Sequence, residues 1–559
     1  MLLASLLRAL LNLLKLPFVP LWWALRLLGR PRTPWIEVRI RRRLVELVGR
    51  RPSALARLAP WLAGARPTAL EDLRRLAAHA ARDRRVEGVV FVVPMLAVGW
   101  ATARSLRDVL GGLRKAGKRV AVFLPDGGTH KELYVASAAD TILMPPQATL
   151  SMLGVAARSR YFKGLLDKAG VRVERFARAE FKTAGENLVR DRMSGPQRTQ
   201  LGALLDAIDG ELRGALGAGR GLDAGAVEAL FEEGFLRGPA AIARGVVDVL
   251  AYEDEIAAAL QPGVARPRLG QGDAYLRFRE ARWFHPLRRE PYVAVVPVHG
   301  PIGVGRRADR VVAALRVARK DPGVRGVILH VNSPGGSATV SDRVYREVAR
   351  VSEKKPVVAC FGDVAASGGY YVAAGAAAIV AQPTTVTGSI GVVSARLVAT
   401  ELLERLGVRT EVLRRAPHAD MFSPSRPLDD DERAILKREM DGFYRDFVAL
   451  VARGRGRSVD EVEALARGRI WAGVDAQREG LVDRLGGLET AMEELRVRLG
   501  GARLRPRLLL PRSTDIRPEP SEPALAFFGA LAPGAIALWE LARGPDRVLL
   551  LDPTVPDFP

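Results

Sequence analysis

Short apolar runs alternate with longer amphipathic stretches between residues 35 and 261. The apolar runs are typical of buried strands, and the stretches with a period near 3.6 residues are typical of helices. Such alternation favours parallel sheets whose crossover connections are helices. The predicted strands are 35–40, 86–93, 119–124, 141–144 and 171–176, and the predicted helices are 69–82, 101–116, 197–216 and 224–233.

The same alternation restarts near residue 291 and continues to about residue 500. A long helix is expected near its end, and Ser458 and Glu461 have the spacing of a capping box that opens another helix. The strands expected in this half are 292–298, 324–331, 356–361, 378–382 and 408–413, and the helices are 308–319, 338–351 and 430–453.

The restart is an internal repeat. Five separated blocks recur at an offset that stays between 235 and 238 residues, and chance is a poor explanation for so constant a spacing. We therefore predict an α/β protein with two tandem domains and mostly parallel sheets. The matching blocks are 86–90 with 324–328, 134–139 with 371–376, 153–155 with 390–392, 169–172 with 406–409, and 244–248 with 479–483.

The repeat suggests five parts along the chain. The two copies are connected by a stretch rich in Pro, Gly and Arg, and apolar or proline-rich segments flank them. The predicted parts are an N-terminal hydrophobic segment at 1–30, a first repeat at 31–261, a linker at 262–290, a second repeat at 291–501 and a C-terminal extension at 502–559.

The N-terminal segment predicts attachment to a membrane. Its longest uncharged run, 16–25, is shorter than the roughly 20 apolar residues that a membrane-spanning helix needs. Pro17 and Pro20 also interrupt any single helix, whereas Trp22 and Trp23 suit a lipid interface. A span with snorkelling cations and an interfacial amphipathic anchor both remain open. Positive charge on both sides of the segment leaves its orientation undecided, and no removable signal peptide is predicted.

The amino-acid composition limits the kinds of binding partner that the protein is expected to have. The 559 residues carry a formal net charge of +23, mostly from arginine, yet no zinc pattern or nucleic-acid-binding motif accompanies the charge. We expect a solvated, arginine-rich surface near anionic lipid rather than a nucleic-acid partner. Cys360, the single cysteine, lies in an apolar run and is expected to be a buried, inert thiol. No metal or cofactor is predicted.

Two glycine-rich segments suggest a serine nucleophile. NSPGG at 332–336 and AASGGYY at 365–371 each follow a predicted strand, and the second contains Ser367. Paired glycines bring backbone N–H groups close to a bound group. The N–H groups of Gly368 and Gly336 could therefore form an oxyanion hole. The flanks of Ser367 lack the G-x-S-x-G pattern of an α/β-hydrolase.

The two copies have lost complementary features. The first copy has PMLAV at 94–98 in place of the glycine loop and no serine aligned with Ser367. It has EFKTA at 180–184, however, where the second copy has PHADM and no lysine. Burial depresses the pKa of a lysine from about 10.4, so that a buried lysine can act as a base. Lys182 is the candidate base for Ser367, and a surface cation is the alternative.

Histidine is the usual activator of serine, but the six histidines show no Ser-His-Asp arrangement. His299 and His330 lie at or near the ends of predicted strands beside the glycine loop, and either could line the site. A packed or exposed imidazole is the simpler interpretation of each.

Four motifs together resemble the signal peptide peptidase A family in its long, tandem-repeat form: NSPGG at 332–336, DVAASGGYY at 363–371, TGSIGV at 387–392 and FKTA at 181–184. The resemblance implies a crotonase-like (Clp-protease-like) fold in each repeat, membrane attachment and a homo-oligomer, tetrameric in the long form. It implies that Ser367 is the nucleophile, Lys182 the base, and Gly368 and Gly336 the oxyanion donors. Ser389 is similar to the serine that orients the lysine amine.

The function that this resemblance implies is a membrane-associated serine endopeptidase with a Ser–Lys dyad. It would cleave residual signal peptides or other apolar peptides through an acyl-enzyme, without a cofactor. Its catalytic domains are expected on the periplasmic or extracytoplasmic face of the inner membrane. Two alternatives stay open: a crotonase-like acyl-CoA enzyme, which uses the same pair of N–H groups, and a catalytically silent envelope scaffold.

Overall fold

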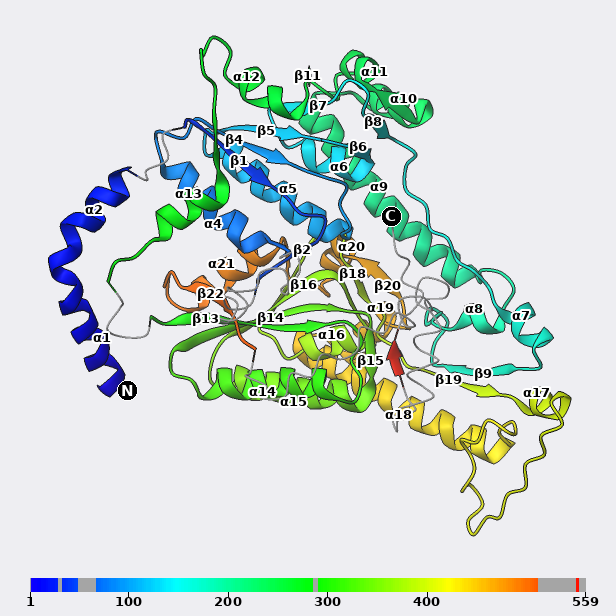
Figure 1. The fold of residues 1–559 in the computed structure, drawn as a ribbon. Helices are drawn as coiled ribbons and strands as arrows, with labels where there is room; N and C mark the ends of the chain where they lie inside the picture. Colours follow the sequence, from blue (N-terminus) through cyan, green and yellow to red (C-terminus); the bar gives the residue numbers. More distant parts are fainter. Residues whose placement is uncertain (1, 29–32, 49–66, 285–289, 511–548, 552–559) are drawn as a thin grey trace. The chain divides into compact units, whose positions relative to one another are not determined.

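The computed structural model describes residues 2–28, 33–48, 67–284, 290–510 and 549–551 (Figure 1). The chain forms two compact units. Unit 1 contains residues 1–155 and 208–291, and unit 2 contains residues 156–207 and 292–559. Residues 156–207 therefore belong to the same unit as the second half of the chain, although the sequence repeat assigns them to the first copy.

Unit 1 is built on a six-stranded sheet in the order β11-β7-β5-β4-β1-β12, and all its neighbouring strands are parallel. Val89, Val90 and Val122 on its central strands are fully buried, as expected for a sheet covered on both faces. The strands are β1 (Trp35–Arg39), β4 (Gly88–Val92), β5 (Arg119–Phe123), β7 (Thr141–Met144), β11 (Val249–Leu250) and β12 (Leu269–Gln271).

Short strands and several helices complete this unit. β8 (Thr149–Ser151) pairs with β6 (Gly127–Thr129) and β10 (Phe235–Arg237), and β2 (Leu44–Val45) pairs with β3 (Thr68–Ala69). The helices are α4 (Leu70–Arg82), α5 (Trp100–Lys115), α6 (His130–Ala136), α10 (Ala224–Glu233), α11 (Gly238–Ala243), α12 (Ile256–Leu260), α13 (Gly272–Glu280) and the 3-10 turn η3 (Glu253–Glu255). α9 (Gly195–Arg220) runs through the boundary at residue 208.

The N-terminal segment is broken at its prolines. α1 (Leu2–Lys15) ends before the 3-10 turn η1 (Leu16–Phe18), and α2 (Val19–Leu28) follows. Proline removes a backbone donor and clashes with the preceding turn, so the chain cannot continue as one helix here. Leu13 and Leu14 are more than half exposed. Among the described residues, no helix combines the length and the apolar character needed to cross a membrane.

Unit 2 contains a larger sheet, with the path β20-β18-β16-β14-β13-β22; β17 also pairs with β16, and β21 pairs with β17. All pairs in it are parallel except β18 with β20. The strands are β13 (Tyr292–His299), β14 (Val324–Ser333), β16 (Val357–Ala366), β17 (Ala378–Ala381), β18 (Val386–Gly388), β20 (Ile470–Ala472), β21 (Arg484–Leu485) and β22 (Arg505–Leu508).

One face of this sheet packs on helices to form the largest core. Leu329 and Val331 of β14 lie in it with Leu315 of α14 and Val344 and Val348 of α15. α14 and α15 run side by side along the sheet (Figure 1). The helices of unit 2 are α7 (Lys163–Lys168), α8 (Glu186–Val189), α14 (Arg306–Lys320), α15 (Ala338–Ser352), α16 (Gly368–Ala373), α17 (Thr400–Arg405), α18 (Asp430–Arg455), α19 (Val459–Leu465), α20 (Gly473–Arg478) and α21 (Leu488–Arg498).

The two main sheets repeat one topology. The order β11-β7-β5-β4-β1-β12 in unit 1 corresponds strand by strand to β21-β17-β16-β14-β13-β22 in unit 2. The tandem repeat and the α/β, mostly parallel fold class predicted from the sequence are therefore confirmed.

A second sheet of unit 2 combines distant parts of the chain. Its order is β15-β23-β19-β9, and each described pair is antiparallel. β9 (Arg172–Ala177) comes from the first repeat, β15 (Gly335–Ser337) and β19 (Val393–Val398) from the second, and β23 (Leu549–Leu551) from the C-terminal extension. Residues 511–548 and 552–559 of that extension lie outside the described residues.

Two expected segments differ from the structure. The range 262–290 contains β12 and α13, and β12 pairs with β1. β12 is only three residues long, and α13 has nine residues with two arginines, so their hydrophobic pattern is weak. The strand predicted at 408–413 is wrong, since residues 407–414 form no strand. The remaining predicted elements correspond to observed ones within a few residues at each end.

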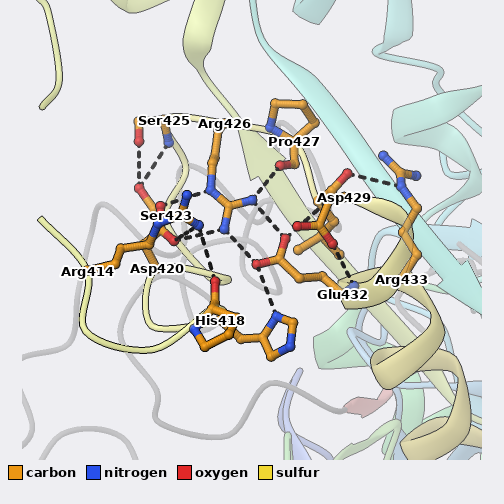
Figure 2. Close-up of polar contacts among 12 residues, drawn as sticks. Arg414, His418, Asp420, Ser423, Ser425, Arg426, Pro427, Asp429, Glu432 and Arg433 are labelled. Carbon is orange, nitrogen blue, oxygen red and sulfur yellow. Dashed lines mark hydrogen bonds and ion pairs between the residues drawn. The ribbon is translucent and has the colours of Figure 1, made fainter. Parts of the chain in front are cut away.

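An ion-pair cluster holds the segment between α17 and α18 (Figure 2). The Arg426 guanidinium donates to both carboxylate oxygens of Asp420, at 2.8 and 2.9 Å, and to both of Glu432, at 2.6 and 2.7 Å. The Glu432 carboxylate also accepts the backbone N–H of Asp429 in a capping box. Hydrogen bonds from Arg426 lower the pKa of Glu432 from 4.5 to about 2.

We expect Glu432→Gln to lower the free energy of unfolding at pH 7 by about 1–2 kcal/mol, because a charge-assisted bidentate pair becomes neutral. The folded-state pKa lies below the unfolded value, so the carboxylate stabilises the fold above about pH 4.5 and loses this effect as the pH falls toward 2. Denaturant titrations across this range should show a shallower acid dependence in the variant. Glu439→Gln, an exposed neighbour on α18, is the matched control, and an equal effect there would contradict the prediction.

Candidate active site

Ser367 stands at a strained turn between β16 and α16. Its backbone has φ 55° and ψ −117°, in a region that residues with a Cβ rarely adopt. The backbone N–H donates to the carbonyl of Gly388 at 2.8 Å, which fixes this turn to the end of β18. The side chain is fully buried. A strained residue held this firmly presents its hydroxyl in one direction.

The side chain in direct contact with this hydroxyl is Lys182. The amine Nζ lies 2.8 Å from Ser367 Oγ, 2.8 Å from Ser389 Oγ and 3.0 Å from the carbonyl oxygen of Ser389. All three partners are uncharged oxygen atoms, and Lys182 is completely buried. The arrangement places a basic nitrogen within proton-transfer distance of a serine hydroxyl.

Backbone contacts hold the lysine in place. Arg175 on β9 donates to the carbonyl of Lys182 and, at 2.7 Å, to that of Ala184. The Phe181 N–H donates to the Arg467 carbonyl at 3.1 Å. Since β9 pairs with β19 along six residues, the segment that carries the lysine is anchored on both sides.

Two glycines make room for the lysine side chain. Gly468 has φ +78°. A Cβ added to it would lie 2.4 Å from the backbone nitrogen of Lys182 and 2.5 Å from the Cβ of Lys182. A Cβ on Gly391 would lie 3.2 Å from Lys182 Cδ. Any larger residue at 468 would therefore meet the lysine backbone directly.

Ser389 completes the polar surroundings of the amine. Its φ of 51° is again positive, and its N–H donates to the carbonyl of Arg469 at 2.7 Å. Its hydroxyl and its carbonyl both face Lys182 Nζ. One residue therefore supplies two acceptors that orient the amine toward Ser367.

The glycine loop lies beside Ser367. A Cβ on Gly368 would lie 3.1 Å from the backbone nitrogen of Gly336 and 2.6 Å from Ser341 Oγ. Gly336 itself has φ +155°, and its Cβ would overlap the carbonyl of Ile302 at 2.1 Å. The two backbone segments can approach this closely only because both positions are glycine.

A strand from the C-terminal extension runs along this loop. β23 pairs antiparallel with Gly335–Ser337 of β15 on one side and with Val393 of β19 on the other. An extended peptide thus occupies the space between the glycine loop and the strand next to the lysine segment. The sequence showed no function for this extension.

The predicted residues meet within one unit. Ser367, Lys182 and Ser389 belong to unit 2, because residues 156–207 do. The His299 and His330 imidazoles lie 2.7 Å from each other. Cys360 is buried, as expected.

Sequence reasoning missed the residues that support the lysine. Arg175, Gly391 and Gly468 carry no catalytic group. Gln200 was missed as well, and it connects Thr183 Oγ1, at 2.7 Å, to the Ile470 N–H, at 3.2 Å. Gly391 falls inside the TGSIGV motif, which was a usable signal. Gly468 lies about 290 residues from Lys182 in the sequence, so no local pattern could connect them.

Comparison with known families agrees with this geometry. The sequence profile of peptidase family S49 matches residues 112–265 and 349–500, which together are more than half of the chain. The chain belongs to peptidase family S49. The profile of the Clp proteases also matches, over residues 289–386. The family resemblance drawn from the four motifs is confirmed, and the two separate S49 matches follow the tandem repeat.

Individual S49 relatives are similar over most of the chain. The chloroplastic serine protease SPPA of Arabidopsis thaliana is 30% identical over 428 residues, which cover 74% of this chain and 63% of that protein. Protease 4 of Salmonella typhi is 28% identical over 76% of this chain and 71% of its own length. Protease 4 of Haemophilus influenzae is 30% identical over 69% and 66%. The chain thus spans roughly two thirds of the length of these relatives.

We expect Gly468→Ala to displace Lys182 from Ser367 and to cost about 3 kcal/mol of unfolding free energy, from the positive φ and the overlap together. A crystal structure and a denaturant titration would measure the two effects. Gly500→Ala is the matched control, since Gly500 has φ +67° and a Cβ added there would have no atom of the described residues within 4 Å. The control should cost about 1 kcal/mol. Equal costs at both positions would show that the lysine segment tolerates the added methyl group.

Proposed function

We propose that this S49 family member is a serine endopeptidase in which Ser367 is the nucleophile and Lys182 the general base. The observation that carries the proposal is the 2.8 Å separation of Lys182 Nζ and Ser367 Oγ within one buried site. A serine hydroxyl is a weak nucleophile until a base removes its proton, and here the base is already in contact.

Acylation begins when Ser367 Oγ attacks the carbonyl carbon of the scissile peptide bond and transfers its proton to the neutral Lys182 amine. The tetrahedral intermediate collapses as the C–N bond breaks, and Lys182 returns the proton to the leaving amine. A water molecule then attacks the acyl-enzyme ester, and Lys182 accepts its proton. The proton passes to Ser367 Oγ as the ester bond breaks, so the enzyme regains its starting state.

The neutral amine is favoured by the site itself. Complete burial disfavours the charged ammonium form, because the interior solvates charge poorly. The Ser389 hydroxyl and carbonyl accept the amine's hydrogens and direct its lone pair toward Ser367. Ser389 therefore acts as a positioning residue in the proposed mechanism.

The developing oxyanion needs donors that are in place before the reaction. We assign this role to the backbone N–H groups of Gly368 and Gly336, whose segments lie next to each other beside Ser367. Each such donor contributes about 3 kcal/mol to stabilising the transition state.

The proposed substrate is an extended, apolar peptide, such as a residual signal peptide. The space between β15 and β19 accepts an antiparallel strand, as β23 demonstrates, and such pairing binds a peptide through its backbone. The exposed leucines of α1 support membrane association through the N-terminal segment. By resemblance we propose an inner-membrane location with an extracytoplasmic catalytic unit, and a tetrameric homo-oligomer.

We expect Ser367→Ala and Lys182→Met each to reduce hydrolysis of a signal peptide by about 10⁴-fold or more, since each removes one member of a catalytic unit. Ser389→Ala should reduce it about 100-fold through misplacement of the amine. Initial rates in detergent solution provide the measurement. Lys437→Met, an exposed lysine of α18, serves as the matched control and should retain full activity.

Covalent labelling separates the proposed function from its alternatives. A fluorophosphonate probe should modify Ser367 in the wild type and in Lys437→Met, but neither Ser367→Ala nor Lys182→Met. A crotonase-like acyl-CoA enzyme or a silent scaffold would not be labelled at this serine. Undiminished peptide hydrolysis by Ser367→Ala or Lys182→Met would refute the dyad.

We further expect that a chain lacking residues 549–559 has a KM several-fold lower than the wild type with unchanged kcat, because β23 occupies the proposed position of the substrate strand. Steady-state kinetics with the same peptide would test this. A chain lacking only 552–559 keeps β23 and is the control. If both truncations behave alike, β23 does not compete with substrate.

A further inference from the structure

The hydroxyl of Ser341 is a buried polar group without a hydrogen-bond partner among the described residues. Ser341 lies near the start of α15, and its side chain is fully buried. A buried hydroxyl that has given up its bonds to water and gained none is unfavourable, and such groups are rare in native proteins. A function that supplies the missing partner would account for a hydroxyl at this position.

Ser341 Oγ lies beside the two backbone segments to which we assign the oxyanion donors. A Cβ on Gly368 would lie 2.6 Å from Ser341 Oγ and 3.1 Å from the Gly336 nitrogen, so both atoms are within 3.1 Å of one point next to Gly368. Gly368 is the first residue of α16, and the Cα–Cβ and N–H bonds of a helical residue both lean toward the helix N-terminus. The hydroxyl is therefore on the side of Gly368 toward which its N–H points.

Two other buried serines of this region bind the backbone. Ser333 Oγ accepts the N–H of Gly335 at 3.1 Å and so fixes the glycine loop. Ser337 Oγ accepts the N–H of Val340 at 3.3 Å and caps α15. Of these three serines, only Ser341 has a hydroxyl that is available to a group arriving with the substrate.

The first repeat lacks this hydroxyl together with the nucleophile. α5 and α15 align at the offset of 238 residues that holds for 86–90, and this offset places Ala103 at the position of Ser341. Ala103 is fully buried, as Ser341 is. At the offset of 237 residues that holds farther along, His130 stands at the position of Ser367. The helix therefore packs without a hydroxyl in the copy that has no catalytic serine.

We propose that the Ser341 hydroxyl is a third donor to the oxyanion of the tetrahedral intermediate, beside the N–H groups of Gly368 and Gly336. The inference rests on the proposed function, because it needs Ser367 as the nucleophile. As Ser367 Oγ bonds to the carbonyl carbon, the π electron pair of the C=O bond moves onto the carbonyl oxygen. This oxygen then accepts a hydrogen bond from the Ser341 hydroxyl. Ser341 keeps its proton throughout, so the proton transfer between Ser367 and Lys182 is unchanged.

The missing partner determines which kinetic constant the hydroxyl affects. Ser341 breaks no bond to the protein when it turns toward the oxyanion, so the new hydrogen bond is not offset by a lost one. The oxygen is negatively charged in the tetrahedral state but not in the bound substrate, and a charged acceptor forms the stronger hydrogen bond. An interaction that is stronger in the transition state than in the ground state raises kcat and has little effect on KM.

We expect Ser341→Ala to lower kcat for a signal peptide about 100-fold, with KM within about twofold of the wild type, because one oxyanion donor is lost. The variant should fold, since the first repeat has alanine at the equivalent position, and thermal unfolding of the full-length protein checks this. Ser352→Ala is the matched control. The Ser352 hydroxyl, at the last residue of α15, donates to the Gly375 carbonyl at 2.9 Å, and its loss should leave kcat unchanged.

Two inhibitors separate a direct hydrogen bond from a structural effect. A peptide aldehyde with the substrate's sequence forms a tetrahedral adduct with Ser367, whereas the corresponding peptide alcohol binds without forming one. Ser341→Ala should raise the inhibition constant of the aldehyde about 100-fold and change that of the alcohol by less than about twofold. A displacement of α15 would weaken both inhibitors.

An unchanged kcat in Ser341→Ala, an equal loss of affinity for the aldehyde and the alcohol, or an equal loss of activity in Ser352→Ala would overturn the proposal. Fluorophosphonate labelling of the wild type distinguishes this failure from a failure of the proposed function. A labelled, active wild type beside an unaffected Ser341→Ala refutes only the third donor. An unlabelled, inactive wild type refutes both.

Discussion

The contact between the Lys182 amine and the Ser367 hydroxyl depends on a long-range strand pairing. The two residues are 185 positions apart, and the lysine reaches the serine because β9 pairs with β19. Every other feature of the site supports this contact. Arg175 fixes the lysine backbone, Ser389 orients the amine, and Gly468 leaves the space that the lysine backbone needs.

The site also concentrates unfavourable local conformations. Ser367 and Ser389 both have positive φ values, and the buried lysine amine contacts three uncharged oxygen atoms. Such strain and desolvation persist only where the surrounding structure supplies enough other contacts. Here those contacts are the parallel sheet that ends at Ser367 and the ladder between β9 and β19. Stability in the scaffold therefore offsets a site that would be unfavourable in isolation.

One segment of the first repeat lies in the compact unit of the second repeat. Residues 156–207 lie in the sequence of the first copy but in the compact unit of the second. In the proposed mechanism a base from one copy serves the serine of the other, which would allow each copy to lose half of the catalytic groups. The ion-pair cluster around Arg426 supports the segment that corresponds to the lysine segment in the second copy, where no base is present.

The repeat, the α/β class and most strands and helices could be predicted from the sequence, as could the candidate residues Ser367, Lys182, Gly336, Gly368 and Ser389. These follow from hydrophobic periodicity, from constant offsets and from short motifs, all of which are local or self-comparing signals. The folded chain was needed to show that 408–413 forms no strand and that β23 pairs with the glycine loop. It also decided that Gly468 must be small. Each of these features depends on which distant segment of the chain packs beside the residues concerned. The local sequence pattern indicates which secondary structure a segment prefers, but it does not indicate which segment it pairs with.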